Sequence, residues 1–203
     1  MRAAALVSGD GSQLQSLLDA VYFNEIPDFE LTAIISSSKD ANALKRAKAA
    51  KVDSFVVDPE LFPNITSHSM AVANKLRDMD IQLVILAGYN LPLGVIPFQF
   101  KNRIIGTFPS LIPSFESEDG NIFRSAIERG IKITGATAYI TDSSGCVGPI
   151  IMQQAVNVLE SDSPESLQRR ILEEAEWKLL PEAVRLFAEG RIEIHGGRVI
   201  IKQ

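Results

Sequence analysis

The stretch that decides the fold is Ile104-Ile105-Gly106-Thr107-Phe108-Pro109-Ser110-Leu111-Ile112-Pro113. Its two leading isoleucines predict a buried strand. Pro109 and Pro113 exclude a helix and a central strand beyond that point, because proline lacks a backbone N–H and has a fixed φ. The strand should therefore end in a rigid loop. In an α/β chain such a loop lies at the carboxyl edge of the sheet, where ligands bind.

Strand-like and helix-like segments alternate on both sides of this stretch. Short apolar runs predict strands at Ala3–Val7, Leu31–Ser36, Ser54–Val57, Gln82–Ala87, Arg103–Thr107, Ile131–Thr141 and Ile150–Val158. Apolar residues at 3–4 spacing and composition predict helices after Ser12, over Asp40–Lys51, over Ser67–Met79 with Met70, Ala73 and Leu76 on one face, and over Asn121–Arg129. This alternation predicts an α/β fold: a Rossmann-like, mostly parallel twisted sheet with helices on both faces.

The C-terminal part predicts one long helix and a hairpin. The helix should start at Asp162-Ser163-Pro164-Glu165 and run to about Ala188, with Pro181 kinking or dividing it. Gly196-Gly197 separates two short apolar runs, Arg191–His195 and Arg198–Ile201, which is a strong signal for a two-residue hairpin turn.

Composition narrows the class of protein. The chain has 203 residues, 46% of them hydrophobic and 22% charged, which fits one globular domain with a sizeable core. A net charge of −5 argues against a nucleic-acid partner, and no apolar run reaches the length of a membrane span. A single cysteine, Cys146, fits a reducing cytoplasm. Two histidines, His68 and His195, do not suggest a metal site.

Several motifs in order carry a family resemblance. They are Val7-Ser8-Gly9-x-Gly11-Ser12-x-Leu14-Gln15, Leu86-Ala87-Gly88-Tyr89, Pro109–Pro113, Thr134-Gly135-Ala136-Thr137, Gly148-Pro149-Ile150-Ile151-x-Gln153 and Leu167-Gln168-Arg169-Arg170 through Leu180-Pro181. Together they resemble the glycinamide ribonucleotide (GAR) formyltransferases of purine biosynthesis, whose signature loop reads Asn-x-His-Pro-Ser-Leu-(Leu/Ile)-Pro. The resemblance implies a single formyltransferase-like domain over 1–203, with a phosphate-binding half at 1–100 and a former catalytic and folate-binding half at 101–203.

The Gly9-Asp10-Gly11-Ser12 turn is the expected phosphate site. Between a strand and a helix, glycines let backbone N–H groups converge on an anion at the positive end of the helix dipole. The resemblance places the substrate phosphate at Gly11, Ser12 and Gln13; a plain strand-to-helix turn is the alternative. The resemblance also makes Glu176 the contact for the substrate amine, whereas a solvated acidic helix face, shared with Glu173, is the alternative.

The catalytic positions of the family are replaced. The resemblance puts the family's Asn at Gly106, its His at Phe108, its Asp at Cys146 and a further polar His at Tyr139. Formyl transfer from 10-formyltetrahydrofolate needs donors for a tetrahedral oxyanion and a route for protons. Gly106 and Phe108 supply neither. Cys146 is expected to be a small structural thiol rather than a nucleophile, and Tyr139 an ordinary strand residue rather than a hydrogen-bond donor.

The folate pocket also departs from the family pattern. Its positions fall on Tyr89, Asn90 and Leu91. The loop after Pro113 carries Glu116, Glu118 and Asp119, which would repel a folate with its glutamate tail. These carboxylates would suit a cationic partner, or they belong to a solvated loop.

Three functions remain open. The first is a catalytically degenerate relative that binds a small phosphorylated metabolite, alone or paired with another subunit such as a second copy. The second is an active formyltransferase with unusual residues, which would need 10-formyltetrahydrofolate. The third is different chemistry on the same scaffold, because a fold does not determine a function.

Overall fold

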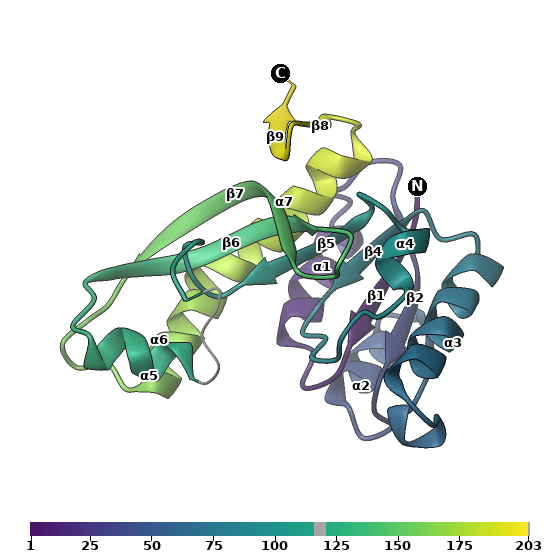
Figure 1. Cartoon of the computed structure of the whole chain (residues 1–203), viewed down its shortest axis with the longest axis horizontal. Coiled ribbons are helices and arrows are strands. Elements are labelled where there is room, and N and C mark those ends of the chain that lie inside the picture. Colours follow the sequence, from purple (N-terminus) through teal and green to yellow (C-terminus); the bar gives the residue numbers. More distant parts are fainter. Residues whose placement is uncertain (116–120, 203) are drawn as a thin grey trace.

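A computed structural model describes residues 1–115 and 121–202 of the chain. Its centre is one seven-stranded sheet with the strand order β3-β2-β1-β4-β5-β6-β7 (Figure 1). The first five strands pair in parallel, whereas β6 pairs antiparallel with both β5 and β7. The strands are β1 (Arg2–Val7), β2 (Glu30–Ser36), β3 (Asp53–Val56), β4 (Leu83–Leu86), β5 (Ile104–Phe108), β6 (Ile133–Thr141) and β7 (Val147–Asn157). The predicted α/β fold with a mostly parallel sheet is confirmed.

Helices cover both faces of the sheet, as the sequence predicts. Side chains alternate along β1, so that Ala3, Ala5 and Val7 enter one core while Ala4 and Leu6 enter the other. The first core also contains residues of α1 (Ser12–Tyr22), α2 (Asn42–Ala49), α5 (Ile122–Glu128), α6 (Pro164–Ile171) and α7 (Trp177–Ala188). The second contains residues of α3 (Ile65–Asp78) and α4 (Ile96–Gln99), and the short helix η1 (Pro59–Leu61) precedes α3.

The buried face of α3 differs from the predicted one. Ala73 and Leu76 are buried as expected, but Met70 is 50% exposed. The buried stripe instead runs through His68, Ser69 and Val72. His68 replaces Met70 on this face because its ring Nε2 donates a hydrogen bond to the Val57 carbonyl at 2.9 Å and the ring packs edge-on against Phe62.

The long C-terminal helix is divided, but not at the predicted proline. A π turn, η2 (Leu172–Glu176), separates α6 from α7, and Pro181 lies inside α7. Proline at 181 lacks the N–H that would bond the Trp177 carbonyl, so the helix carries one missing bond there. The irregular turn lies just before that gap, and π turns of this kind are frequent at functional sites.

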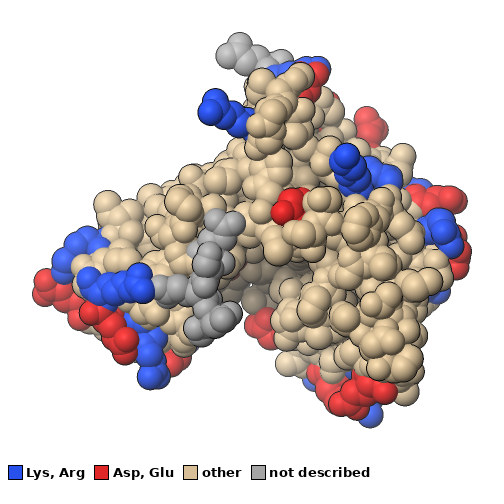
Figure 2. All heavy atoms as spheres, in the orientation of Figure 1, with Lys and Arg blue, Asp and Glu red and all other residues tan. Residues whose placement is uncertain are grey.

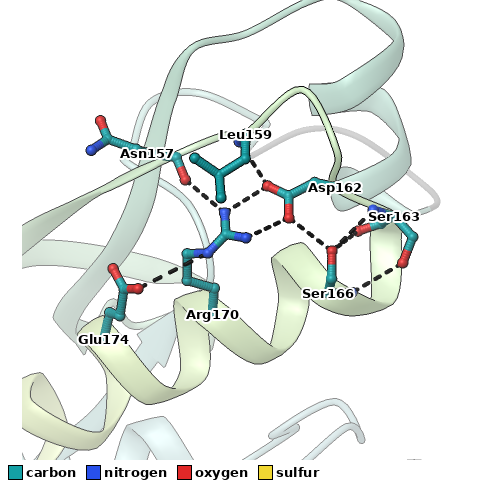
Figure 3. A network of polar contacts seen from close by, with 7 residues as sticks. All are labelled: Asn157, Leu159, Asp162, Ser163, Ser166, Arg170 and Glu174. Atoms are coloured by element: carbon teal, nitrogen blue, oxygen red, sulfur yellow. Dashed lines mark hydrogen bonds and ion pairs between the residues drawn. The ribbon is translucent and has the colours of Figure 1, made fainter.

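Figure 3 shows how the start of α6 is fastened to the end of β7. The Arg170 guanidinium donates to both carboxylate oxygens of Asp162, at 2.6 and 2.5 Å, and to the Asn157 carbonyl at 3.0 Å. Asp162 also accepts from Ser166 Oγ at 2.8 Å and from the Leu159 N–H at 2.8 Å. The Ser163 and Ser166 side chains complete a capping box at the first turn of α6.

The signature loop is tied to the antiparallel strands. Thr137 Oγ1 on β6 donates to the Ser110 carbonyl at 2.7 Å and accepts from the Ile112 N–H at 3.1 Å. Gln153 on β7 donates to Thr137 Oγ1 at 2.9 Å and to the Ile112 carbonyl at 3.1 Å. Because these bonds hold the loop in place, the Pro109–Pro113 motif depends on the motifs that contain Thr137 and Gln153.

The C-terminal hairpin also confirms its prediction. β8 (Ile192–His195) and β9 (Arg198–Ile201) pair antiparallel around Gly196 and Gly197, which both have positive φ. In Figure 1 the hairpin stands beyond the end of α7, while β6 and β7 reach away from the parallel part of the sheet toward α5 and α6. Of the helices in the described ranges, none is long and apolar enough to cross a membrane.

Candidate functional site

The turn between β1 and α1 has the predicted strand–turn–helix form. Gly11 precedes the helix with φ at 76°, a left-handed conformation that favours glycine. A Cβ at this position would lie 2.8 Å from Ala43 Cα on α2, which leaves no room for a side chain. The glycine therefore has a structural reason in addition to any role in binding an anion.

The Asp10 carboxylate accepts hydrogen bonds from the first residue of α1. Its Oδ1 accepts from the Ser12 N–H at 3.2 Å and from Ser12 Oγ at 3.0 Å. The side-chain amide of Gln13 donates to Glu176 and not toward the turn. The backbone N–H of Gln13, within the first turn, has no acceptor in the helix. An arriving phosphate would have this amide available and would compete with Asp10 for Ser12.

A cavity of about 260 Å³ lies at the carboxyl edge of the parallel strands. It brings the β1–α1 turn together with the end of β4, the start of the signature loop and the π turn. The lining residues are Gly9, Asp10, Gly11, Ser12, Gln13, Ala87, Gly88, Pro109, Phe123, Gln168, Leu172 and Glu176. The predicted phosphate residues and Glu176 thus share one cavity. Figure 2 shows the molecule hollowed between its two lobes, with charged side chains mostly at the rim of this face.

Glu176 is a buried carboxylate, only 5% exposed, at the last position of the π turn. Gln13 Nε2 at 2.7 Å and Thr107 Oγ1 at 2.8 Å both donate to the same oxygen, Oε1. Burial raises the pKa of the Glu176 carboxyl, and the hydrogen bonds from Thr107 and Gln13 oppose that shift. A solvated acidic face is therefore the wrong description for Glu176, although it fits the exposed Glu173.

Thr107 is a site residue that the sequence reasoning missed. It lies between Gly106 and Phe108 on β5, and alternation along the strand turns its side chain to the opposite face from theirs. The available signal was a polar residue within an otherwise apolar strand. Its partner Glu176, in the π turn, is far away in sequence, so the contact itself had no local signature.

Tyr139 fills the space beside Gly106. The two residues pair directly across β5 and β6. A Cβ built on Gly106 would lie 3.1 Å from Tyr139 Oη, 3.2 Å from Tyr139 Cζ and 3.3 Å from Leu86 Cδ1. Burial first, and the nearby Cys146 second, raise the pKa of Tyr139 to about 12, so its phenol keeps its proton at neutral pH. A protonated hydroxyl therefore lies in tight contact, at 3.1 Å, with the place where the Cβ of a side chain at position 106 would be.

Phe108 is the last residue of β5 and is half-buried. It pairs with Thr137 on β6, and its carbonyl accepts from the Ser110 N–H at 2.8 Å. The cavity is lined by its neighbour Pro109 and not by Phe108. The Phe108 ring therefore does not occupy the cavity that contains Glu176.

The loop between β6 and β7 is organised by Asp142, a second residue that the sequence reasoning did not single out. Its Oδ1 accepts from the Ser144 N–H at 2.8 Å, from Ser144 Oγ at 2.6 Å and from the Cys146 N–H at 3.0 Å. These hydrogen bonds, led by that from the Ser144 hydroxyl, lower the pKa of the Asp142 carboxyl. Cys146 is exposed at the end of this loop.

The three predicted folate positions follow β4. Tyr89 packs against the core under α3 and α4, and its Oη is buried without a hydrogen-bond partner among the described residues. Burial raises the pKa of Tyr89 to about 12. The Asn90 N–H donates to Ser8 Oγ at 3.1 Å, and Leu91 is half-buried. None of the three lines the cavity that holds Glu176.

Two further sequence expectations concern charge and metal. Glu116, Glu118 and Asp119 lie outside the described residues. Within residues 1–115 and 121–202, no group of three or more His, Cys, Asp or Glu side chains is arranged to hold a metal ion.

Comparison with known proteins agrees with this architecture. The Formyl transferase family model matches residues 1–184. A phosphoribosylglycinamide formyltransferase of Haemophilus influenzae is 30% identical over 194 residues, which cover 95% of this chain and 90% of that protein. The trifunctional purine biosynthetic protein adenosine-3 of Gallus gallus is 29% identical over 96% of this chain, which spans only 19% of that larger protein.

A solved structure shows the same fold at higher identity. The crystal structure of glycinamide ribonucleotide transformylase 1 from Symbiobacterium toebii superposes with a TM-score of 0.94 at 42% identity, covering 100% of this chain and 94% of that one. The family model extends from β1 into α7 and so includes the cavity, the signature loop and Glu176. This chain belongs to the formyl transferase family.

Proposed function

We propose that the chain binds a small ribonucleotide-like phosphate, of the kind represented by GAR, and has lost formyl transfer. The observation that carries the first part is the shared cavity. Glu176 and the first turn of α1 both line this cavity, which has a volume of about 260 Å³. A helix N-terminus favours an anion, and a buried carboxylate with one free oxygen favours an amine. Phosphate and amine groups of one small molecule would meet these two sides.

The second part rests on the groups that lie beside the cavity. Gly106 has no side chain, and Phe108 has no hydrogen-bonding group. The loss of a single oxyanion donor lowers a rate by about 10²–10³, and general acid–base help is worth about 10²–10⁴. The rate losses at the replaced positions are not additive, but together they should still remove most of the family's formyl-transfer activity.

Binding and turnover are tested separately. Calorimetry with GAR and with ribose 5-phosphate should show binding of both, with GAR tighter because only GAR carries the amine. Asp10→Asn should tighten both ligands about threefold or more, since it removes a charge that repels phosphate yet retains the cap on the Ser12 N–H. Absence of binding at millimolar ligand would contradict the proposal.

A steady-state assay with GAR and 10-formyltetrahydrofolate tests the loss of transfer. We expect no turnover in the normal enzymatic range. Rebuilding the family residues needs Gly106→Asn, Phe108→His and Cys146→Asp together with Tyr139→Ala, because the Tyr139 hydroxyl would lie only 3.1 Å from the Cβ of the new Asn. The triple variant that retains Tyr139 is the matched control and should regain less activity than the quadruple variant.

The alternative is an active formyltransferase that uses 10-formyltetrahydrofolate and non-standard residues. One observation favours it: the protonated Tyr139 hydroxyl beside Gly106 is a hydrogen-bond donor at that place. Wild-type turnover that falls by two or more orders of magnitude in Tyr139→Phe would establish this alternative. Turnover that is unaffected by Tyr139→Phe would also contradict the loss of transfer and would assign the catalysis to residues other than Tyr139.

The proposal also covers the cellular compartment and the partners of the protein. We place it in the cytoplasm, consistent with a single free cysteine, and without a nucleic-acid or membrane partner. Association with a second copy is open to measurement by light scattering with and without GAR.

A further inference from the structure

The opposite edge of the sheet carries a second concave site. An open groove of about 800 Å³ lies where β1, β4 and β5 begin and where α3 and α4 end. It is lined by Arg2, Arg77, Asp80, Ile81, Gln82, Gln99, Phe100 and Arg103. In open α/β sheets ligands usually bind at the carboxyl edge, so an arginine-rich groove at the amino edge is not a consequence of the fold.

Most of the positive charge in this groove is not neutralised. Three arginines face one acidic residue, Asp80. Arg2 has an exposed ion pair with Glu30 at 3.3 Å. Neither Arg77 nor Arg103 has a carboxylate partner in the described part of the chain. In a chain with a net charge of −5, this groove is a local excess of cations.

Neutral groups hold the guanidinium groups in place. Arg103 Nη2 donates to the Gln99 carbonyl at 2.9 Å, and the guanidinium lies 5.2 Å from the centre of the Phe100 ring. Arg2 Nε donates to the Met79 carbonyl at 3.2 Å. Arg77 Nη2 donates to Asn74 Oδ1 at 2.9 Å. These bonds position Arg77 and Arg103 at the ends of α3 and α4, and they leave the charge of both side chains uncompensated.

We propose that this groove is a second anion site, which binds a small ligand through a diphosphate group. Guanidinium groups pair with phosphate oxygens through two parallel charged hydrogen bonds, and each arginine here retains N–H donors beyond those it uses in the fold. The groove is several times larger than one phosphate requires, and its arginines come from three separate elements. Figure 2 shows Lys and Arg side chains next to one another near the place where Figure 1 marks the N-terminus.

Calorimetry with inorganic pyrophosphate and with ADP tests the site. Both should bind the wild-type protein, and both should weaken by about tenfold or more in Arg77→Gln/Arg103→Gln. Arg77→Gln alone covers the case in which loss of Arg103 disturbs α4, because the Arg77 side chain is exposed and, within the part of the chain that the structure describes, bonds only Asn74. Asp80→Asn should tighten both ligands, since it removes the negative charge that lines the groove and asparagine tolerates the φ of 53° there.

Arg169→Gln is the matched control for the single variant Arg77→Gln, because it removes an exposed arginine on α6 with the same change in net charge. Its affinity for pyrophosphate should equal that of the wild type. The proposal fails if pyrophosphate does not bind at millimolar concentration, if only ADP binds, or if Arg77→Gln/Arg103→Gln binds as tightly as Arg169→Gln. Unchanged affinity in the double variant would assign the anion to the β1–α1 turn instead.

Discussion

Asp162 and Glu176 are two buried carboxylates at the two ends of α6 and its π turn, and their surroundings differ by one charge. The Asp162 side chain is 1% exposed and is paired with Arg170, which is 20% exposed. Hydrogen bonds from Arg170 lead the effects that lower the pKa of Asp162 to about 2. Among the described residues, Glu176 receives hydrogen bonds only from the neutral groups of Gln13 and Thr107, and burial raises its pKa.

This difference separates an acid that stabilises the fold from one that is a candidate for binding a ligand. The Asp162 carboxylate has its charge matched and its oxygens occupied, so it fastens α6 to the end of β7. The two donors to Glu176 share Oε1, and the residue lines a cavity. An acid that is buried without a counter-charge at a cavity is a candidate for binding a cation from outside.

The largest expected effect comes from removing the charge partner of Asp162. Arg170→Met leaves a buried carboxylate without compensation, which should cost about 3 kcal/mol of unfolding free energy and lower Tm by about 6–12 °C. Thermal unfolding measures this. Arg169→Met, at an exposed neighbouring position, should change stability by less than about 0.5 kcal/mol. Equal losses of stability in Arg170→Met and Arg169→Met would show that Asp162 does not need Arg170 as a charge partner.

The pH dependence of stability should have opposite signs at the two acids. The folded-state pKa of Asp162 is about 2, below its unfolded value of about 3.9. Its contribution is therefore present above about pH 3.9 and is lost as the pH falls through 2. The stability difference between the wild type and Asp162→Asn, from urea unfolding at pH 2.5 to 6, should shrink toward acid. A difference that stays constant would contradict the assignment.

Glu176→Gln should stabilise the protein at alkaline pH. A raised folded-state pKa means that stability from this group is present below about pH 4.3 and is lost as the pH rises through the folded value. Gln removes the charge and keeps the acceptor for Thr107 and Gln13, so we expect a gain of about 1 kcal/mol at pH 8 and little change at pH 4. Glu173→Gln is the exposed control. Glu176→Gln should also weaken GAR binding. A Glu176→Gln variant that is less stable than the wild type at pH 8 would contradict the description of Glu176 as a buried acid without a counter-charge.

The smallest expected effect concerns one hydrogen bond to Glu176. Thr107→Val removes the 2.8 Å bond to Oε1 and should cost about 1 kcal/mol or less, while the pKa of Glu176 rises further. Thr107→Ser retains the hydroxyl and should stay near the wild type. Carboxyl chemical shifts, followed by NMR through a pH titration, give the pKa. No difference between the two variants would show that Thr107 does not position the carboxylate.

Local pattern predicted most of the fold. Apolar runs predicted the seven strands of the sheet and glycine pairs predicted the hairpin, because both depend on neighbouring residues. Met70 and the break in the C-terminal helix were predicted wrongly for the same reason. Helical spacing does not say which side of α3 packs on the sheet. The π turn at Leu172–Glu176 has no local signature comparable to that of Pro181.

The amino-acid sequence by itself determined the family and predicted the glycine turn, and it predicted that the family's catalytic positions fall on Gly106, Phe108, Tyr139 and Cys146. The tertiary structure alone decided that Tyr139 fills the space beside Gly106, that Thr107 and Gln13 hold Glu176, and that Asp10 engages Ser12. The physical reason is distance along the chain. A motif records backbone requirements within a few residues, whereas burial, charge compensation and shared space depend on segments that meet only after folding.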